Sequence, residues 1–395
     1  MPADTAFFRH LPKTAGTSLI TTLANVYGEA RCHRFTDIAD ATGPRFSRTV
    51  QDNAASPALV SGHVPLSMVA AGGVGEEFTV LREPIARLLS MRRFFERLPA
   101  VERQGLGFGE RITVADLLDA PHPTVRGQVR NGMVRFFCGD HPFADPAAEA
   151  FSAPAPPDEA IQAAMGALET MTVGFVEDMP AALDAIRRRL RVPYALETPV
   201  ENATAAAAEE VSVEEVRALV EANGVDLAIF HALSRRIARL GPPGPARDPG
   251  RHDPRTLFDP QPGARYESAA IPGRQGFEIC RVDAPVSWIG PTGCGRIHLA
   301  PSPSALSLSI ALYPVAPRYP VERVVFRVDG RRWPHTVFRG PENVSFQLAP
   351  LPPHAGIMEL AILQPAAIPV TIVEQGASDE RSLGVALLGI ACDDR

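Results

Sequence analysis

The sequence is nearly without lysine, and this absence is its most informative feature. Lys13 is the only lysine among 395 residues, whereas Lys and Arg together number 39. A composition rich in Ala, Arg, Pro and Gly is typical of a GC-rich bacterial genome, which would itself replace lysine with arginine. Because Lys13 survives in the stretch HLPKTAGTSL, we expect its site to need a compact ammonium group rather than a planar guanidinium.

The chain also lacks the features of several other protein classes. Its five cysteines are scattered and show no CxxC spacing, so we expect free thiols in a reducing compartment rather than a disulfide framework or a zinc site. A formal charge of −6 gives no global basic field for nucleic acid. No apolar run approaches the ~18 to 20 residues of a membrane helix, and no signal peptide is visible. We therefore expect a soluble, cytoplasmic protein.

Short apolar runs alternate with helical patterns over the first 240 residues. Strands are predicted at 5–11, 58–61, 77–81 and 172–176, and helices at 18–26, 84–97, 179–189 and 226–240. Ser212 and Glu215 form a predicted capping box at the start of another helix. This alternation predicts an α/β domain with a parallel sheet flanked by helices.

The texture of the sequence changes at residue 241. Residues 242–264 are dense in Pro, Gly and Asp and are predicted to be a linker. Short strand-like runs separated by turn residues then fill 265–395, which predicts an antiparallel β-sandwich of jelly-roll type. In this second domain, Trp288 and Trp333 could stack on sugar rings or pack in the core, and core packing is the commoner use.

The segment PKTAGTS lies between a predicted strand and a predicted helix, an arrangement that builds anion sites. Gly16 allows close backbone approach, Thr17 and Ser18 supply hydroxyl donors, and Lys13 supplies a point charge. The Walker order GxxxxGK[ST] is absent, because Lys13 comes three residues before Gly16.

The order Pro-Lys-Thr-x-Gly-Thr-Ser resembles the phosphosulfate loop of the sulfotransferases. It is especially similar to the carbohydrate sulfotransferases related to heparan sulfate 2-O-sulfotransferase. The resemblance implies a P-loop-like sulfotransferase fold for residues 1–241. It also implies that the loop binds the 5′-phosphosulfate of 3′-phosphoadenosine 5′-phosphosulfate (PAPS) through Lys13, Thr14, Ala15, Gly16, Thr17 and Ser18.

A second anion motif is expected in FTVLREPIARLLSMRRFF. Arg82 ends a predicted strand, and Ser90 follows eight residues later on a predicted helix. The pair resembles the family's 3′-phosphate motif, and Arg87 is an alternative phosphate ligand because it lies one turn before Ser90. Arg92, Arg93 and Arg97 are interpreted as a solvated helix face.

Sulfuryl transfer to a hydroxyl needs a base for the acceptor proton and a charge to stabilise the leaving oxygen. His63 directly follows a predicted strand, at the edge where open α/β sheets bind ligands. SGHVPL also resembles the family's Gly-His segment, so His63 is our candidate base, with Lys13 balancing charge on the leaving oxygen. Weaker candidates for the base are His10, His33, His122 and Glu83.

Three further segments resemble parts of the same family. Asn131–Gly139 resembles the segment after its substrate-side helices, where Arg130 and Arg135 could bind an acidic acceptor or cover the surface. Val173–Leu190 resembles its late strand-helix unit and is expected to be structural. ANGVDLAIFHAL, residues 222–233, resembles the closing helix and is expected to be structural.

The resulting hypothesis is a PAPS-dependent sulfotransferase acting by in-line, metal-free transfer on a hydroxyl acceptor. We expect a carbohydrate or glycoconjugate acceptor, and neither a nucleic-acid partner nor a membrane span. A P-loop kinase-like enzyme that uses ATP, and a non-catalytic nucleotide- or glycan-binding protein, remain alternatives.

Overall fold

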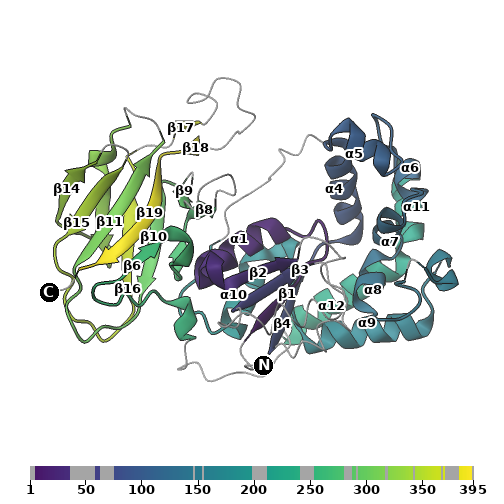
Figure 1. Cartoon of the computed structure of the whole chain (residues 1–395). Coiled ribbons are helices and arrows are strands. Elements are labelled where there is room, and N and C mark those ends of the chain that lie inside the picture. Colours follow the sequence, from purple (N-terminus) through teal and green to yellow (C-terminus); the bar gives the residue numbers. More distant parts are fainter. Residues whose placement is uncertain are drawn as a thin grey trace. The chain divides into compact units, whose positions relative to one another are not determined.

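The computed structural model describes most of the chain (Figure 1). The described residues are 5–35, 58–62, 75–145, 147–153, 155–197, 211–240, 253–279, 287–290, 292–315, 319–340, 343–365, 368–369 and 382–393.

A five-stranded sheet forms the centre of the N-terminal half. Its strands are β1 (Ala6–Arg9), β2 (Cys32–Phe35), β3 (Leu59–Gly62), β4 (Glu76–Leu81) and β5 (Thr172–Phe175), in the order β2-β3-β1-β4-β5. The pairs β1–β3, β1–β4 and β4–β5 are parallel. Every residue of β1 and β3 is buried, as expected for strands covered on both faces. The predicted parallel α/β architecture is confirmed.

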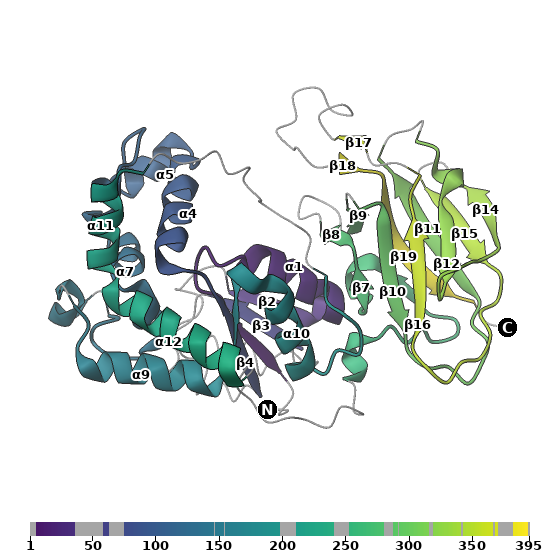
Figure 2. The same cartoon turned by 180° about the vertical axis from the view of Figure 1, so that it is seen from behind.

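Among the described residues of this half, helices contribute to two apolar cores. One core packs α8 (Gly132–Phe137), α9 (Asp158–Thr170) and α12 (Gly224–Leu240) with residues of β5. The other joins α4 (Pro84–Glu96), α6 (Val114–Leu118), α7 (Pro123–Val129) and α11 (Val213–Ala222). The other α-helices among the described residues are α1 (Gly16–Tyr27), α5 (Ala100–Gly105) and α10 (Met179–Arg189). Figure 2 shows α4, α7 and α11 to one side of the sheet.

Local signals place the ends of these helices. The predicted capping box is present, since Ser212 accepts from the Glu215 amide and Glu215 accepts from the Ser212 amide. Pro84 occupies the first turn of α4, and the Glu83 carboxylate accepts from the Ile85 and Ala86 amides.

The C-terminal part consists mainly of two antiparallel sheets. One has the order β13-β12-β16-β10-β7, and the other β14-β15-β11-β19-β9-β8 with β6 paired to β19. The strands are β6 (Arg265–Glu267), β7 (Arg274–Gln275), β8 (Phe277–Ile279), β9 (Ser287–Ile289), β10 (Cys294–Leu299), β11 (Leu308–Pro314), β12 (Val325–Val328), β13 (Arg331–Arg332), β14 (His335–Arg339), β15 (Val344–Leu348), β16 (Met358–Leu363) and β19 (Val385–Cys392), with a separate pair β17 (Ile368–Pro369) and β18 (Ser382–Leu383). One apolar core takes Phe326 and Leu360 from the first sheet and Phe346 and Leu387 from the second, so the antiparallel sandwich is confirmed.

Contacts divide the chain into two compact units that cut across the sequence boundaries. Unit 1 comprises Met1–Gly16, His33–Arg191 and Asn202–Gly250, and unit 2 comprises Thr17–Cys32, Val192–Glu201 and Arg251–Arg395. Nearly all of α1 thus belongs to unit 2. There the Asn25 amide donates to the Phe277 carbonyl at 2.7 Å, and the Gly273 amide donates to the Val26 carbonyl at 2.8 Å.

Within the predicted linker 242–264, the structure describes only residues 253–264. From Asp253 onward this segment is packed into unit 2, where Thr256 and Phe258 are buried and the Phe258 amide donates to the His298 carbonyl at 2.9 Å. Turn composition indicated an irregular backbone correctly, but irregular backbone can still be buried when its polar groups are paired.

Among the described residues, no helix is long and apolar enough to cross a membrane. Four of the five cysteines are described, and Cys32, Cys138, Cys294 and Cys392 are free thiols.

Candidate functional site

The loop between β1 and α1 has an unusual backbone. Lys13 has φ 69° and Ala15 has φ 58°, whereas Thr14 and Gly16 have negative φ. The left-handed region costs a non-glycine residue about 1–2 kcal/mol. Alternating left- and right-handed residues turn successive amides toward one point, which is the geometry of an anion-binding nest.

Two contacts hold this backbone in place. The buried Thr14 hydroxyl donates to the Leu11 carbonyl at 2.8 Å. Gly16 lies against the His10 ring so closely that a Cβ there would be 1.8 Å from His10 Nε2. The Thr14 side chain therefore stabilises the loop conformation. Position 16 requires glycine, because any side chain there would overlap the His10 ring. Thr17 is half-buried and Ser18 is buried at the start of α1.

Lys13 lies in a positively charged environment. Its Nζ is 4.4 Å from the centroid of the Phe94 ring, a cation–π contact. Burial lowers the pKa of Lys13, and the neighbouring Arg82 and Arg97 guanidinium groups lower it further. Among the described residues, the charged groups that act on the Lys13 ammonium are both cations, a condition that an incoming anion would relieve.

Arg82, which directly follows β4, lies near Lys13. The parallel register pairs Arg9 with Thr79, so the loop after β1 and Arg82 after β4 leave the sheet at the same carboxyl edge. Burial lowers the pKa of the Arg82 guanidinium, Glu177 raises it, and Arg93 lowers it.

Ser90 belongs to the face of α4 that meets Lys13. It lies one turn before Phe94, and residues four apart on a helix share a face. Ser90 is half-buried. The structure thus brings Lys13 and Arg82 together beside the helix face that carries Ser90.

Arg93 and Arg97 were interpreted from the sequence only as solvated arginines. The structure places them as electrostatic neighbours of Arg82 and Lys13, respectively. Arg92 is not solvated either, since its side chain is only 11% exposed and approaches Glu215 at 4.0 Å. The missed signal was the spacing of Ser90, Phe94 and Arg97, which are three and four residues apart and lie on one helix face.

Arg87 does not serve as the alternative phosphate ligand in this structure. Its side chain is fully buried, and its Nη2 donates to the Gln128 carbonyl at 2.7 Å. Asp226 is its charged neighbour. Arg87 therefore takes part in the packing between α4 and α7.

Arg135 does not lie on the surface and is not placed to bind an acceptor. It is buried between the Phe143 and Phe151 rings, and it donates to the carbonyls of Phe143 and Phe151. Arg130 pairs with Asp119 at 3.2 Å and donates to the Leu118 carbonyl.

The segment expected to be structural, residues 222–233, supports α8 from α12. Asp226 accepts from the Met133 and Val134 amides at the first turn of α8. The Asn131 amide donates to Asn223 Oδ1 at 3.0 Å. These bonds satisfy amides that a helix start leaves open, and they support the structural interpretation.

The candidate base His63 lies outside the described residues. The strand that precedes it, β3, ends at Gly62, whose carbonyl accepts from the His10 amide at 3.1 Å. The chain therefore leaves β3 beside the end of β1, at the edge where the loop containing Lys13 begins.

The weaker base candidates have other surroundings. His10 is buried and stacks on Phe8, with ring centroids 5.5 Å apart. His33 is half-buried in β2, and His122 precedes α7 as its N-cap residue. Glu83 caps α4, so its carboxylate oxygens already accept two amides.

No family model matches the sequence, and no curated protein matches it. Among solved structures, a cycloisomaltooligosaccharide glucanotransferase from Paenibacillus sp., complexed with cycloisomaltoheptaose, is 10% identical with a TM-score of 0.20, and the match covers 33% of this chain and 18% of that one. The 4-O-methyl-α-glucuronidase BtGH115A of family GH115 is 15% identical with a TM-score of 0.22, covering 60% of this chain and 30% of that one. The chain thus spans less than a third of the length of either structure, and TM-scores this low show neither a shared fold nor a shared function.

Proposed function

We propose that this protein is a PAPS-dependent sulfotransferase that transfers a sulfuryl group to a hydroxyl acceptor, with a carbohydrate or glycoconjugate as the expected acceptor class. The proposal rests chiefly on one observation. Lys13, in a loop with two left-handed residues, lies beside Arg82 at the carboxyl edge of a parallel sheet.

The donor set fits a ligand that carries anionic groups at two positions. The loop offers amides and one ammonium group, which suit a phosphosulfate. Arg82 offers a fork of N–H donors, and Ser90 a hydroxyl, for a separate phosphate. The lowered pKa of Lys13 supports the same assignment, because uncompensated cations disfavour the charged form until an anion arrives.

When bound, PAPS would supply an activated sulfuryl group. Lys13 would bind its 5′ side and balance the charge that grows on the leaving oxygen. Arg82 and Ser90 would hold the 3′-phosphate and so orient the nucleotide. We assign His63 as the residue that takes the acceptor proton, because the chain leaves β3 for His63 at the same edge of the sheet.

Two other functions stay open as rivals. A kinase-like enzyme would need ATP, and the order of residues in the loop argues against it because no Walker motif is present. A binding protein without catalysis would keep the nucleotide site and lack turnover.

Isothermal titration calorimetry with 3′,5′-adenosine diphosphate, and separately with ATP plus Mg²⁺, tests the proposal. We expect tighter binding of 3′,5′-adenosine diphosphate, because only this ligand has a phosphate for Arg82 and Ser90. Arg82→Ala should weaken its binding by about tenfold or more. Preference for ATP in the unaltered protein would refute the sulfotransferase assignment.

Arg111→Ala is a matched control, because Arg111 is an exposed arginine of the same unit. His63→Ala tests the base separately, with labelled PAPS and a panel of glycans, lipids and small alcohols. It should abolish transfer and leave nucleotide binding nearly unchanged. Loss of binding in this variant would instead place His63 among the nucleotide ligands.

A further inference from the structure

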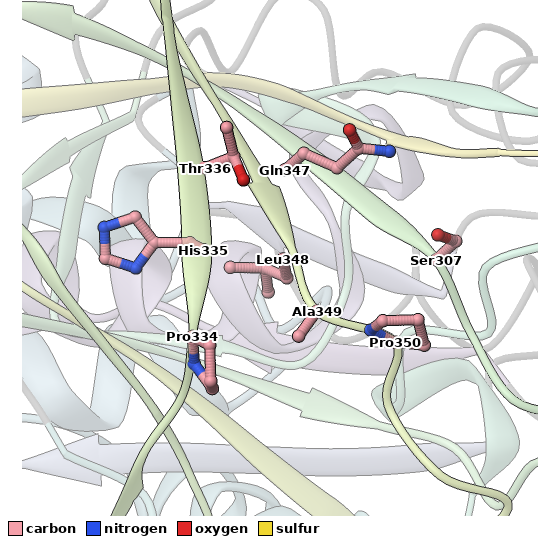
Figure 3. A pocket seen from close by; sticks show the side chains of 8 residues that line it. All are labelled: Ser307, Pro334, His335, Thr336, Gln347, Leu348, Ala349 and Pro350. Carbon is pink, nitrogen blue, oxygen red and sulfur yellow. The ribbon is translucent and has the colours of Figure 1, made fainter.

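A small pocket opens at the end of β14 and β15 in unit 2 (Figure 3). Its volume is about 290 Å³, near the lower end of the range for small-molecule sites. It is lined by Ser307, Pro334, His335, Thr336, Gln347, Leu348, Ala349 and Pro350. No Lys, Arg, Asp or Glu is among these residues, so the lining offers hydrogen bonds and apolar contact rather than charge.

Sheet register gathers the polar groups of the pocket on one face. Thr336 pairs with Gln347, and Gln347 pairs with Ser309 on the next strand. Side chains of directly paired residues lie on the same face of a sheet. This face points away from the sandwich core, because the alternate residues Phe346 and Leu348 are buried in that core. Figure 3 shows Thr336 and Gln347 together, with His335 directed elsewhere.

A carboxylate orients the central amide of this row. Asp393 Oδ2 accepts from Gln347 Nε2 and from Ser309 Oγ, each at 3.2 Å. The contact fixes which end of the Gln347 amide faces the carboxylate, so its Oε1 is presented as an acceptor. A fixed amide and neighbouring hydroxyls suit a ligand that both donates and accepts hydrogen bonds.

An exposed aromatic ring continues the same face. Phe338 lies two residues beyond Thr336 on β14, which is about 7 Å along the strand. Its side chain is 52% exposed, and the residue paired with it is the small Ser345. An exposed ring beside a row of neutral hydrogen-bonding groups is a platform for the apolar face of a sugar ring.

Neither Trp288 nor Trp333 provides an exposed ring for sugar stacking at the pocket. Trp333 packs against the sandwich core and donates from Nε1 to the Ala349 carbonyl at 2.7 Å, as the core-packing interpretation predicts. Trp288 meets Tyr313 edge-on, with ring centroids 6.2 Å apart, on a different part of the sheet.

We propose that this pocket and Phe338 together bind a neutral carbohydrate chain. One sugar would occupy the pocket beside Thr336 and Gln347, and a neighbouring sugar would stack on Phe338. The uncharged lining favours hydroxyl-rich over sulfated or uronic-acid chains. The site is separate from the Lys13 loop and does not depend on the sulfotransferase assignment, so either can fail while the other stands.

Affinity electrophoresis of the full chain tests the site, with a soluble β-glucan, a galactomannan, a xylan or heparin cast into the gel. We expect at least one neutral polysaccharide to retard the protein more than heparin does. Phe338→Ala should weaken that binding by about tenfold, and Gln347→Ala by about fivefold.

Gln261→Ala is the matched control, because Gln261 is an exposed glutamine of the same unit outside the pocket. It should migrate like the unaltered protein. Both pocket residues are exposed, so the variants should keep the melting temperature. The proposal is overturned by no retardation in the neutral gels, by stronger retardation with heparin, or by unchanged retardation in both pocket variants. It is also overturned if the unaltered protein is a dimer and Phe338→Ala makes it a monomer, because a second copy of the chain would then occupy this face.

Discussion

At the scale of single residues, the loop after β1 keeps a backbone that its own side chains disfavour. Neither Lys13 nor Ala15 is glycine, yet both have positive φ. Each such residue costs about 1–3 kcal/mol and persists only where the surroundings impose it. Here Thr14 and His10 impose it, so the amides are already arranged before any ligand binds.

Lys13→Met should show that the charge of Lys13 costs stability in the free protein. Burial and the neighbouring Arg82 and Arg97 all disfavour the ammonium. We expect the variant to gain slightly in the free energy of unfolding, because solvent screens much of the effect at this half-buried group, while losing affinity for 3′,5′-adenosine diphosphate. Urea unfolding and calorimetry measure the two effects.

Lys13→Arg is the comparison that separates charge from shape. It keeps the cation, so nucleotide binding should persist, whereas transfer should fall because a planar fork replaces a compact charge. A Lys13→Met protein that is less stable, or that binds the nucleotide normally, would contradict the role assigned to this lysine.

Gly16→Ala should destabilise the protein by about 1–3 kcal/mol, because an added Cβ would overlap the His10 ring. Thermal or urea unfolding measures the loss. His10→Ala removes the ring, so the double variant should be less destabilised than the sum of the two single variants by more than about 0.5 kcal/mol. Strict additivity would show that the close approach of Gly16 and His10 is not what constrains the loop.

The sequence could predict the residues of the loop but not their conformation. The sequence predicts a strand, then the loop PKTAGTS, then a helix. The order of residues in this motif and in the later Arg82–Ser90 motif predicts Lys13, Arg82 and Ser90 as anion ligands. The contact of Lys13 with Phe94 could not be read, because it joins residues 81 positions apart in sequence. Arg87 was misjudged for a related reason: spacing along a helix shows which residues share a face, but not which face packs inward.

At the scale of secondary-structure elements, hydrophobic pattern was a reliable guide where strands are fully buried. β1, β3, β4 and β5 lie within or close to the predicted runs, because parallel strands covered on both faces read as continuous apolar segments. Within the apolar run 321–328, the strand β12 begins only at Val325, because residues 321–323 form a 3-10 turn after Pro320. Proline and tertiary contacts override a pattern of apolar residues there.

His298 in β10 should make unit 2 sensitive to acid. Its ring is buried against Tyr194, with centroids 3.7 Å apart, and burial together with Arg296 lowers its pKa to about 4. An unfolded histidine takes up a proton near pH 6.5, whereas the folded one resists down to about pH 4. The unfolded state therefore binds more protons in this window, and stability should fall as the pH decreases through it, by about 2 kcal/mol at pH 5.

His298→Phe should flatten this pH dependence. Phenylalanine keeps the stack on Tyr194 and removes both the titrating group and a buried Nε2 that has no hydrogen-bond partner among the described residues. Urea unfolding at pH 7 and pH 5 measures the difference, and His354→Phe is a control because His354 is only half-buried. An unchanged slope in the His298 variant would mean that other groups cause the acid sensitivity.

At the scale of the whole molecule, the chain path could not be predicted from local signals. The change in composition at residue 241 correctly predicts a β-rich C-terminal part. Composition does not show, however, which segments pack together into one compact unit. Unit 2 takes α1 and Val192–Glu201 from the N-terminal half. The pairs that recruit them, Asn25 with Phe277 and Tyr194 with Thr256, join residues far apart in sequence.

A chain that ends at residue 252 should therefore fold poorly, although sequence composition marks residues 242–264 as a place to cut. Such a chain keeps α1 but loses Phe277 and Gly273, to which Asn25 and Val26 are hydrogen-bonded. It also leaves Tyr194, which is half-buried in unit 2, without Thr256 and His298. Exposing these surfaces should lower the melting temperature by several degrees or cause aggregation, as measured by thermal unfolding and size-exclusion chromatography.

Asn25→Ala in the full chain tests the same contact without a truncation. Its buried amide donates to the Phe277 carbonyl, so losing it should cost about 1–3 kcal/mol by urea unfolding. If the shortened chain instead melts like the full chain and binds 3′,5′-adenosine diphosphate equally well, residues 1–252 form an autonomous domain. The conformation of the nucleotide loop would then not depend on the β-rich part. In that case α1 would fold with the parallel sheet, as the order of elements in the sequence predicts.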